Sequence, residues 1–185
     1  MTPVFASISR FFNPFSRVLI AASTVLLVLM AANPVAAKPG IGTTTGLPLP
    51  RFASLKSDRV NLREGPSKDH RTLWIYQKAG LPIEITAEFE TWRRIRDSEG
   101  TEGWVLHSLL SGRRTGLVAP WMKEGTVALH AKPTDQAAVV AQLSPTVLGT
   151  LKRCDGTWCR ITGEGFDGYI KQDRLWGAYP DEMLE

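Results

Sequence analysis

The chain has 185 residues and carries 22 lysines and arginines against 18 acidic residues, for a net charge of +4 at pH 7. Acidic residues are interleaved with the basic ones, which differs from the dense basic surface of a nucleic-acid-binding protein, so nucleic acid is not an expected partner. The chain holds two cysteines, too few for a cysteine-rich metal site.

The first 37 residues have the pattern of a signal peptide. Arg10 and Arg17 give a positively charged start, and an apolar run at 18–32 precedes small residues at 35–37. We expect cleavage after Ala37, which removes both arginines and lowers the net charge from +4 to +2. The mature chain is then expected in the periplasm or outside the cell, without a stable membrane span. The alternative is an uncleaved N-terminal anchor, since the apolar run is long for a signal peptide.

The next segment, 38–51, is rich in Gly, Thr and Pro and has neither helical nor alternating periodicity, so it is predicted to be an extended linker. Two units are expected after it, at 52–116 and 117–178. An acidic tail is expected at 179–185.

The two units are copies of one repeat. Residues 60–67 (VNLREGPS) recur at 127–134 (VALHAKPT), 91–95 (TWRRI) at 157–161 (TWCRI), and 102–105 (EGWV) at 167–170 (DGYI). Such fixed spacing indicates a duplicated structural unit. Since a domain of about 60 residues is only marginally stable alone, neighbouring copies could share an interface.

Each copy has the pattern of a β domain. Residues 81–87 alternate apolar and polar side chains, as a half-buried strand does. Hairpins are expected around the turns at 98–100 and 163–165, and no stretch of the mature chain has a convincing helical stripe. The sequence therefore predicts an all-β protein made of two small sandwiches or barrels in tandem.

The order of these motifs resembles the bacterial SH3 domain family. The first copy carries the resemblance most closely, through its segments at 59–67, 79–86, 91–97, 103–105 and 109–115. The second copy departs from it, with His130, Ala131 and Lys132 after its first strand and Tyr169 in place of the first copy's Trp104. The resemblance implies two tandem SH3-like β-barrels of the kind found on exported proteins that contact cell-wall peptides, other proteins or a partner enzyme domain.

Cys154 and Cys159 flank an Asp-Gly pair, which is a strong hairpin signal, so the two thiols are expected to face each other across a tight turn. In an oxidising compartment they are expected to form a disulfide that pins this turn. A redox-active pair, a metal site and a cysteine nucleophile paired with a histidine are the alternatives. No metal or other cofactor is expected, because no histidine lies near the pair and no phosphate loop or zinc-helix motif is present.

A ligand-binding surface is expected where aromatic side chains lie beside a few polar groups. In the first copy the candidates are Trp74, Tyr76, Trp92, Arg93 and Asp97. In or beside the second copy they are Trp121, Trp158 and Trp176. Four of these tryptophans have a structural alternative: Trp92 and Trp158 could close the end of a barrel, and Trp121 and Trp176 could seal the interface between the copies.

These observations together predict an exported, non-enzymatic binding protein. The expected partner is the peptidoglycan stem peptide or another envelope protein. The alternative is an accessory or targeting subunit for a separately encoded cell-wall hydrolase. The first copy is the expected ligand-binding copy, and the second is expected to support it.

Overall fold

The computed structural model describes residues 40–185, in which both copies of the repeat belong to the same unit of the chain. The segment with the expected signal peptide lies outside the described residues. Within 40–185 there is no helix of the length and apolar character needed to cross a membrane.

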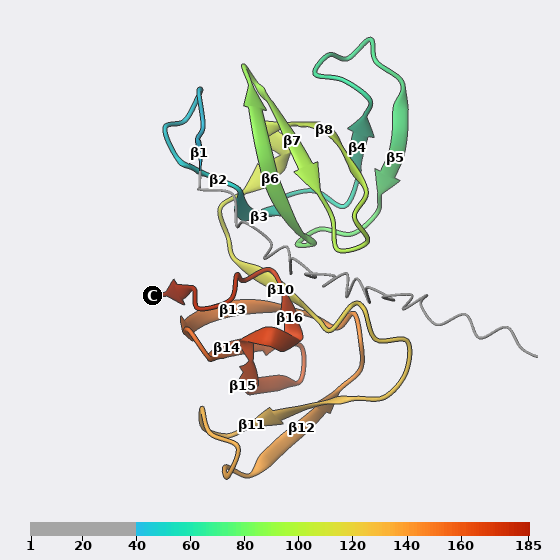
Figure 1. Ribbon diagram of the computed structural model, residues 1–185. Coiled ribbons are helices and arrows are strands. Elements are labelled where there is room, and N and C mark those ends of the chain that lie inside the picture. The colour runs from blue at the N-terminus through green and yellow to red at the C-terminus, as the bar shows by residue number, and fades with distance from the viewer. Residues whose placement is uncertain (1–39) are drawn as a thin grey trace, which may run out of the picture. The chain divides into compact units, whose positions relative to one another are not determined.

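The first copy is a seven-stranded antiparallel sheet that curls into a small barrel (Figure 1). Its strands follow the order β5-β4-β8-β7-β6-β3-β9 across the sheet. In chain order the elements are β3 (Arg51–Leu55), β4 (Val60–Arg63), β5 (Thr72–Tyr76), β6 (Pro82–Phe89), β7 (Trp92–Arg96), β8 (Glu102–Leu106), the 3-10 turn η1 (His107–Leu109) and β9 (Leu110–Ser111).

The second copy repeats this order as β12-β11-β15-β14-β13-β10-β16. Its elements are β10 (Thr115–Val118), β11 (Val127–His130), β12 (Val139–Leu143), β13 (Leu148–Asp155), β14 (Trp158–Gly163), β15 (Phe166–Lys171), η2 (Gln172–Arg174) and β16 (Leu175–Trp176). The register repeats as well, because Arg63 pairs with Trp104 in the first copy and His130 with Tyr169 in the second. The all-β fold and the tandem pair of small barrels are thus confirmed.

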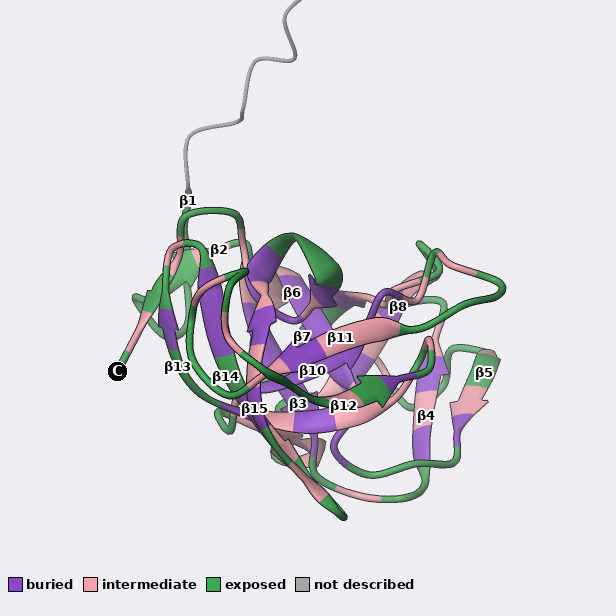
Figure 2. Cartoon of the chain, turned by 90° about the horizontal axis from the view of Figure 1, so that it is seen from below, coloured by how far each residue is buried: buried purple, intermediate pink, exposed green. Residues whose placement is uncertain are grey.

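The alternation along β4 shows how the sequence builds each core. Val60 and Leu62 are fully buried, whereas Asn61 and Arg63 lie on the other face of the strand. Because successive side chains of a strand point to opposite faces, this pattern places one row in the core and leaves the other partly exposed. The buried rows of both copies appear as purple stretches of strand in Figure 2.

Gly103 and Gly168 occupy equivalent places in β8 and β15. A Cβ atom at Gly103 would lie 2.6 Å from Leu62 Cγ and 2.8 Å from the carbonyl oxygen of Arg63. At Gly168 it would lie 2.8 Å from the carbonyl oxygen of His130. Each glycine therefore allows the close approach of the neighbouring strand that closes its barrel.

The segment expected to be an extended linker is instead partly folded. β1 (Gly40–Ile41) and β2 (Pro48–Leu49) form a two-stranded hairpin. The carboxylate of Glu88, on β6, accepts hydrogen bonds from the backbone N–H groups of Thr44 and Thr45 at 3.0 and 2.9 Å. The hairpin is held by a partner more than forty residues away, which local periodicity does not reveal.

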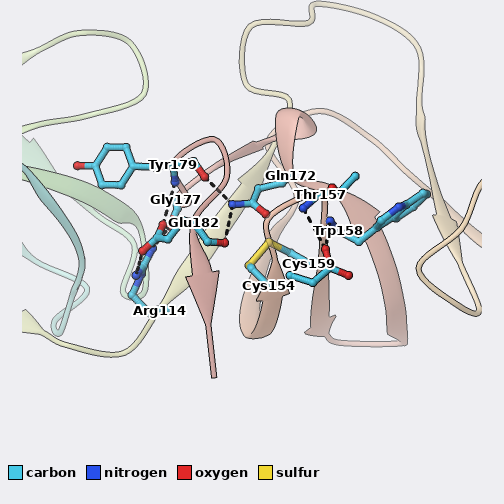
Figure 3. The surroundings of a disulfide bond; sticks show 10 residues. Arg114, Cys154, Thr157, Trp158, Cys159, Gln172, Gly177, Tyr179 and Glu182 are labelled. Atoms are coloured by element: carbon cyan, nitrogen blue, oxygen red, sulfur yellow. Dashed lines mark hydrogen bonds and ion pairs between the residues drawn. A yellow bond between two sulfur atoms is a disulfide. The ribbon is translucent and has the colours of Figure 1, made fainter. Parts of the chain in front are cut away.

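The segment expected to be an acidic tail also belongs to the second sheet. β17 (Met183–Leu184) pairs with β13, so that Leu184 lies opposite Cys154. Gln172 Nε2 donates hydrogen bonds to the carbonyl oxygens of Tyr179 and Glu182, which fixes the returning chain (Figure 3). The second copy also begins slightly earlier than expected, at Thr115 in β10.

The two copies are joined by direct hydrogen bonds. Thr115 Oγ1 donates to the carbonyl oxygen of Gly80 at 2.7 Å, and Trp176 Nε1 donates to that of Pro82 at 3.2 Å. The Trp176 ring also packs edge-on against Phe52, with centroids 5.2 Å apart. Trp176 therefore lies in the interface between the copies, which is the structural alternative given for it above. Trp121, for which the same role was considered, is 54% exposed.

The expected disulfide joins Cys154 and Cys159 across the hairpin between β13 and β14, with their Cα atoms 4.1 Å apart (Figure 3). The turn between them is held by Asp155, whose Oδ1 accepts hydrogen bonds from the backbone N–H groups of Thr157 and Trp158 at 2.9 and 2.7 Å. These bonds lower the pKa of Asp155. Both cysteines are buried in the second core.

Candidate functional site

A groove with a volume of about 360 Å³ opens where the first copy meets the second. Trp74, Tyr76 and Asp97, three of the expected ligand-binding residues, all line it. Leu117 and Thr146 of the second copy line it as well. Both copies therefore contribute walls to one groove.

Trp74 is the most exposed aromatic side chain of this groove, at 59%. It lies on β5, an edge strand whose only neighbour in the sheet is β4. The pairing of β4 with β5 shifts its register directly beside it, because Leu62 pairs with Trp74 but Arg63 pairs with Thr72, which leaves Leu73 of β5 as the extra residue. Such bulges bend a strand and increase its twist, and they re-aim side chains at sheet edges. The exposed indole is available to cover an apolar group of a ligand.

Tyr76 and Asp97 form the polar wall of the groove. The Tyr76 hydroxyl donates a hydrogen bond to Asp97 Oδ2 at 2.9 Å. Asp97 Oδ1 accepts from the backbone N–H groups of Glu99 and Thr101 at 3.0 and 2.9 Å, which shapes the turn after β7. Burial and the Asp97 carboxylate raise the pKa of the Tyr76 hydroxyl, which therefore stays protonated. Asp97 is thus a positioning residue for this wall.

Two exposed charges of opposite sign also line the groove. Lys78 follows β5, and Glu99 lies in the turn that Asp97 shapes. Among the described residues, neither forms an ion pair. The groove therefore offers an ammonium and a carboxylate beside an aromatic surface, a combination that suits a ligand carrying both charges and apolar groups.

Thr146 enters the groove in an unusual backbone conformation, with φ at 64°. A β-branched residue at positive φ is a conformational outlier. Its backbone N–H donates to the carbonyl oxygen of Val118 at 2.7 Å, which helps to hold the turn in place. Such strain tends to gather at functional sites.

Trp92 and Arg93, the other two expected residues, do not lie in this groove. Trp92 is 7% exposed and lines a separate pocket on the first copy. Arg93 is 5% exposed, and its Nη1 donates to the carbonyl oxygens of Glu90 and Trp92 at 2.9 and 2.7 Å. Arg93 therefore holds the turn between β6 and β7.

In the second copy, Trp158 lines a separate pocket of about 390 Å³ together with Asp135 and Lys171, apart from the groove that Trp74 lines. Trp158 is 7% exposed and is covered by neighbours: the His130 ring lies 5.3 Å away between centroids, and Lys171 Nζ lies 5.6 Å from the centroid of its ring.

The sequence did not identify three residues that line the Trp74 groove, namely Lys78, Leu117 and Thr146, because they belong to no motif. The only signal for Leu117 and Thr146 was the short connection between the copies.

Within residues 40–185, no group of three or more His, Cys, Asp or Glu side chains is arranged to hold a metal ion.

Comparison with known families gives a match over both copies. The family described as bacterial SH3 domain matches residues 56–112 and 123–177, which together make up more than half of the chain. No curated protein matches the chain significantly.

Three solved structures show remote similarity. NlpC2 and NlpC1 from Trichomonas vaginalis are 16% and 15% identical, over 69% and 73% of this chain and 48% of each of theirs, both with a TM-score of 0.32. An NlpC/P60 family protein from Bacillus cereus ATCC 10987 is 10% identical over 68% of this chain and 55% of its own, with a TM-score of 0.30. The chain spans about half the length of these proteins. Scores this low do not bear on its function.

Proposed function

Because the chain belongs to the bacterial SH3 domain family, a family of binding domains, we propose that it works by reversible binding of a short peptide. The proposed ligand is the peptidoglycan stem peptide, and the proposed site is the groove between the two copies. The pattern of the first 37 residues supports export to the periplasm or the cell exterior.

The exposure of Trp74 is the observation that carries this proposal. A tryptophan that is 59% exposed at the mouth of a groove leaves apolar surface in water, and a ligand would cover it. Tryptophan is also enriched among the residues that dominate binding energy. The indole is therefore the proposed anchor for the ligand's apolar side chains.

The charges of the groove support a short peptide that is both cationic and anionic. Lys78 would pair with a carboxylate and Glu99 with an ammonium group, and a stem peptide carries both. A volume of about 360 Å³ is at the lower end of the range for ligand pockets, about 300–1,000 Å³. That size favours a few residues of peptide over a whole polymer chain.

The experiment is a calorimetric titration of the mature chain with purified muropeptides. Trp74→Ala is expected to weaken binding by about tenfold or more, as removal of a hot-spot residue does. Trp121→Ala is the matched control, because Trp121 is 54% exposed and does not line the groove. Equal affinities of the two variants would refute the proposed site, and an absence of binding to any muropeptide would refute the proposed ligand.

The second candidate is an envelope protein partner, which includes a separately encoded cell-wall hydrolase that this chain would target or regulate. It is favoured by apolar side chains exposed on the edge strands, namely Leu73 on β5 and Val139 and Val140 on β12. Exposed edges of this kind can pair with a strand of another protein. Retention of a protein on the immobilised mature chain, without muropeptide binding, would support this role.

A further inference from the structure

A second pocket, of about 200 Å³, lies on the first copy around Trp92. Asn61 and Arg63 line it because they alternate with the buried Val60 and Leu62 along β4 and so share the strand's outer face, and Arg59 lines it from the position just before the strand. Lys68 joins them from the loop after β4. The rest of the lining is apolar and consists of Trp92, Leu106 and Leu109. No residue lines both this pocket and the Trp74 groove.

The polar side of this pocket is entirely cationic or neutral. None of its three cations, Arg59, Arg63 and Lys68, forms an ion pair with another residue of the described chain. Arg63 Nη1 donates to the carbonyl oxygen of His70 at 2.7 Å, which orients the guanidinium and leaves its other N–H groups available. Three cations gathered in one pocket repel each other unless an anion joins them.

In the second copy, the equivalent place holds a carboxylate of the chain itself. Asp135 stands at the repeat position of Lys68, and Lys171 at that of Leu106. Lys171 Nζ lies 2.8 Å from Asp135 Oδ1 and 5.6 Å from the centroid of the Trp158 ring. In the second copy the lysine is therefore paired with a carboxylate of the same chain, and it also lies near the face of the tryptophan ring. The equivalent place in the first copy has cations and a tryptophan but no carboxylate.

We propose that the Trp92 pocket binds the terminal carboxylate of a short peptide. The cations would hold the carboxylate, with a guanidinium able to bind both of its oxygens. Leu106 and Leu109 would contact a small apolar side chain on the same terminal residue, and the Asn61 amide can donate to or accept from the peptide bond before it. Inorganic phosphate has no apolar part for this surface, whereas the terminal residue of a peptide brings a side chain together with its carboxylate, so a peptide terminus fits the lining better.

This proposal does not rest on the Trp74 groove, and the probe is chosen to keep the two apart. The mature chain is titrated with N-acetyl-alanyl-alanine, with the same compound amidated at its C-terminus, and with inorganic phosphate. Two-dimensional NMR follows the Trp92 indole and the Asn61 amide, while the Trp74 indole reports on the groove.

The free acid is expected to shift the Trp92 and Asn61 signals saturably, with an affinity at least tenfold above that of the amide. The double variant Arg59→Gln, Lys68→Gln is expected to lower that affinity about tenfold and to stay folded, since both side chains are exposed. Lys68→Asp, which introduces the carboxylate of the second copy, is expected to abolish binding. Arg71→Gln removes an exposed charge outside the pocket and is expected to change nothing.

Equal binding of acid and amide would overturn the proposal, as would an unshifted Trp92 signal with the acid. Tighter binding of phosphate than of the acid would assign the pocket to phosphate and overturn the carboxylate. Trp74→Ala is expected to leave the shifts at Trp92 unchanged, so failure of the groove proposal and failure of this one can be told apart.

Discussion

The hydroxyl of Tyr179 donates a hydrogen bond of 2.7 Å to Oε1 of Glu84, a residue 95 positions earlier in the chain. Glu84 is 3% exposed, and its second oxygen accepts from Arg96 Nε at 2.8 Å. Burial and the Glu84 carboxylate raise the pKa of Tyr179, which keeps its proton for this bond. The bond joins the first copy to the chain that follows the second.

We expect Tyr179→Phe to lower the free energy of unfolding by about 1.5 kcal/mol, the lower end for a hydrogen bond to a charged group, because the tyrosine is partly exposed. Urea unfolding measures the change. Tyr169→Phe is the matched control, since no hydrogen bond of the Tyr169 hydroxyl is seen within residues 40–185, and its stability is expected to stay near that of the parent. Equal losses in the two variants would contradict the role of this bond.

Gly103→Ala is expected to destabilise the first copy by about 1–3 kcal/mol, the usual effect of overpacking. The added Cβ would lie 2.8 Å from the carbonyl oxygen of Arg63, which is backbone and cannot move aside easily. Thermal unfolding is the measurement. Gly112→Ala serves as its control, because a Cβ there meets nothing within 4 Å, and it should leave the melting temperature nearly unchanged.

The disulfide is expected to stabilise the second copy modestly. Replacing both Cys154 and Cys159 with alanine should cost about 2 kcal/mol, since the bond closes a short loop. Urea unfolding of this variant, beside the parent with and without a reducing agent, provides the measurement. A variant that does not fold would show instead that the bond holds the whole domain together.

The N-terminal hairpin is expected to loosen in acid. Burial of the Glu88 carboxylate favours its protonated form, but hydrogen bonds from Thr45, Arg51 and the backbone of Thr44 outweigh this effect and lower its pKa from 4.5 to about 2. A lowered pKa in the folded state means that the stabilisation is complete above pH 4.5 and is lost as the pH falls through about 2.

Hydrogen exchange of the Thr44 and Thr45 amides tests this expectation, because both donate to Glu88. Their protection, corrected for the intrinsic exchange rate, should fall as the pH is lowered toward about 2. In Glu88→Gln the protection should be lower at neutral pH and nearly independent of pH. Constant protection in the parent chain over this range would rule out the role of the carboxylate.

Thr146→Gly is expected to have opposite effects on stability and binding. Glycine adopts a φ of 64° without steric cost, so the change should relieve about 1 kcal/mol of backbone strain. The groove also loses a side chain, and muropeptide binding should weaken. Thr91→Gly is a control in an exposed position without positive φ, where the same change has no strain to relieve and should bring no gain in stability. Because glycine also raises the entropy of the unfolded chain, the comparison with the control is decisive: a loss of stability as large as that of Thr91→Gly would show that Thr146 is not strained.

Local patterns in the sequence predicted the barrels and the disulfide because both depend on neighbours in the chain. Alternation fixes which face of β4 is buried, and the Asp155-Gly156 turn brings Cys154 opposite Cys159. The bacterial SH3 domain resemblance, read from the same motifs, was likewise confirmed over both copies.

Features that depend on distant partners could not be predicted in this way. The hairpin at 40–49 needs Glu88, and β17 needs β13. For the same reason, the sequence identified only part of the candidate site. Trp74, Tyr76 and Asp97 line the groove, whereas Trp92 and Arg93 do not. Trp74 and Trp92 are both tryptophans in strands, yet one is 59% exposed on an edge strand and the other is 7% exposed inside the sheet. Sheet position decides this difference, and sequence alone does not specify it.

The groove with walls from both copies has a consequence for how this chain can change over evolutionary time. After a duplication, one copy is ordinarily free to accumulate substitutions while the other keeps the original role. Here Leu117 and Thr146 of the second copy line the groove, and Trp176 and Tyr179 fix its position against the first copy. Selection for the proposed binding at this groove would therefore act on both copies at once. The second copy could then diverge elsewhere, as its difference from the first copy around Trp158 illustrates, but not along the wall it contributes.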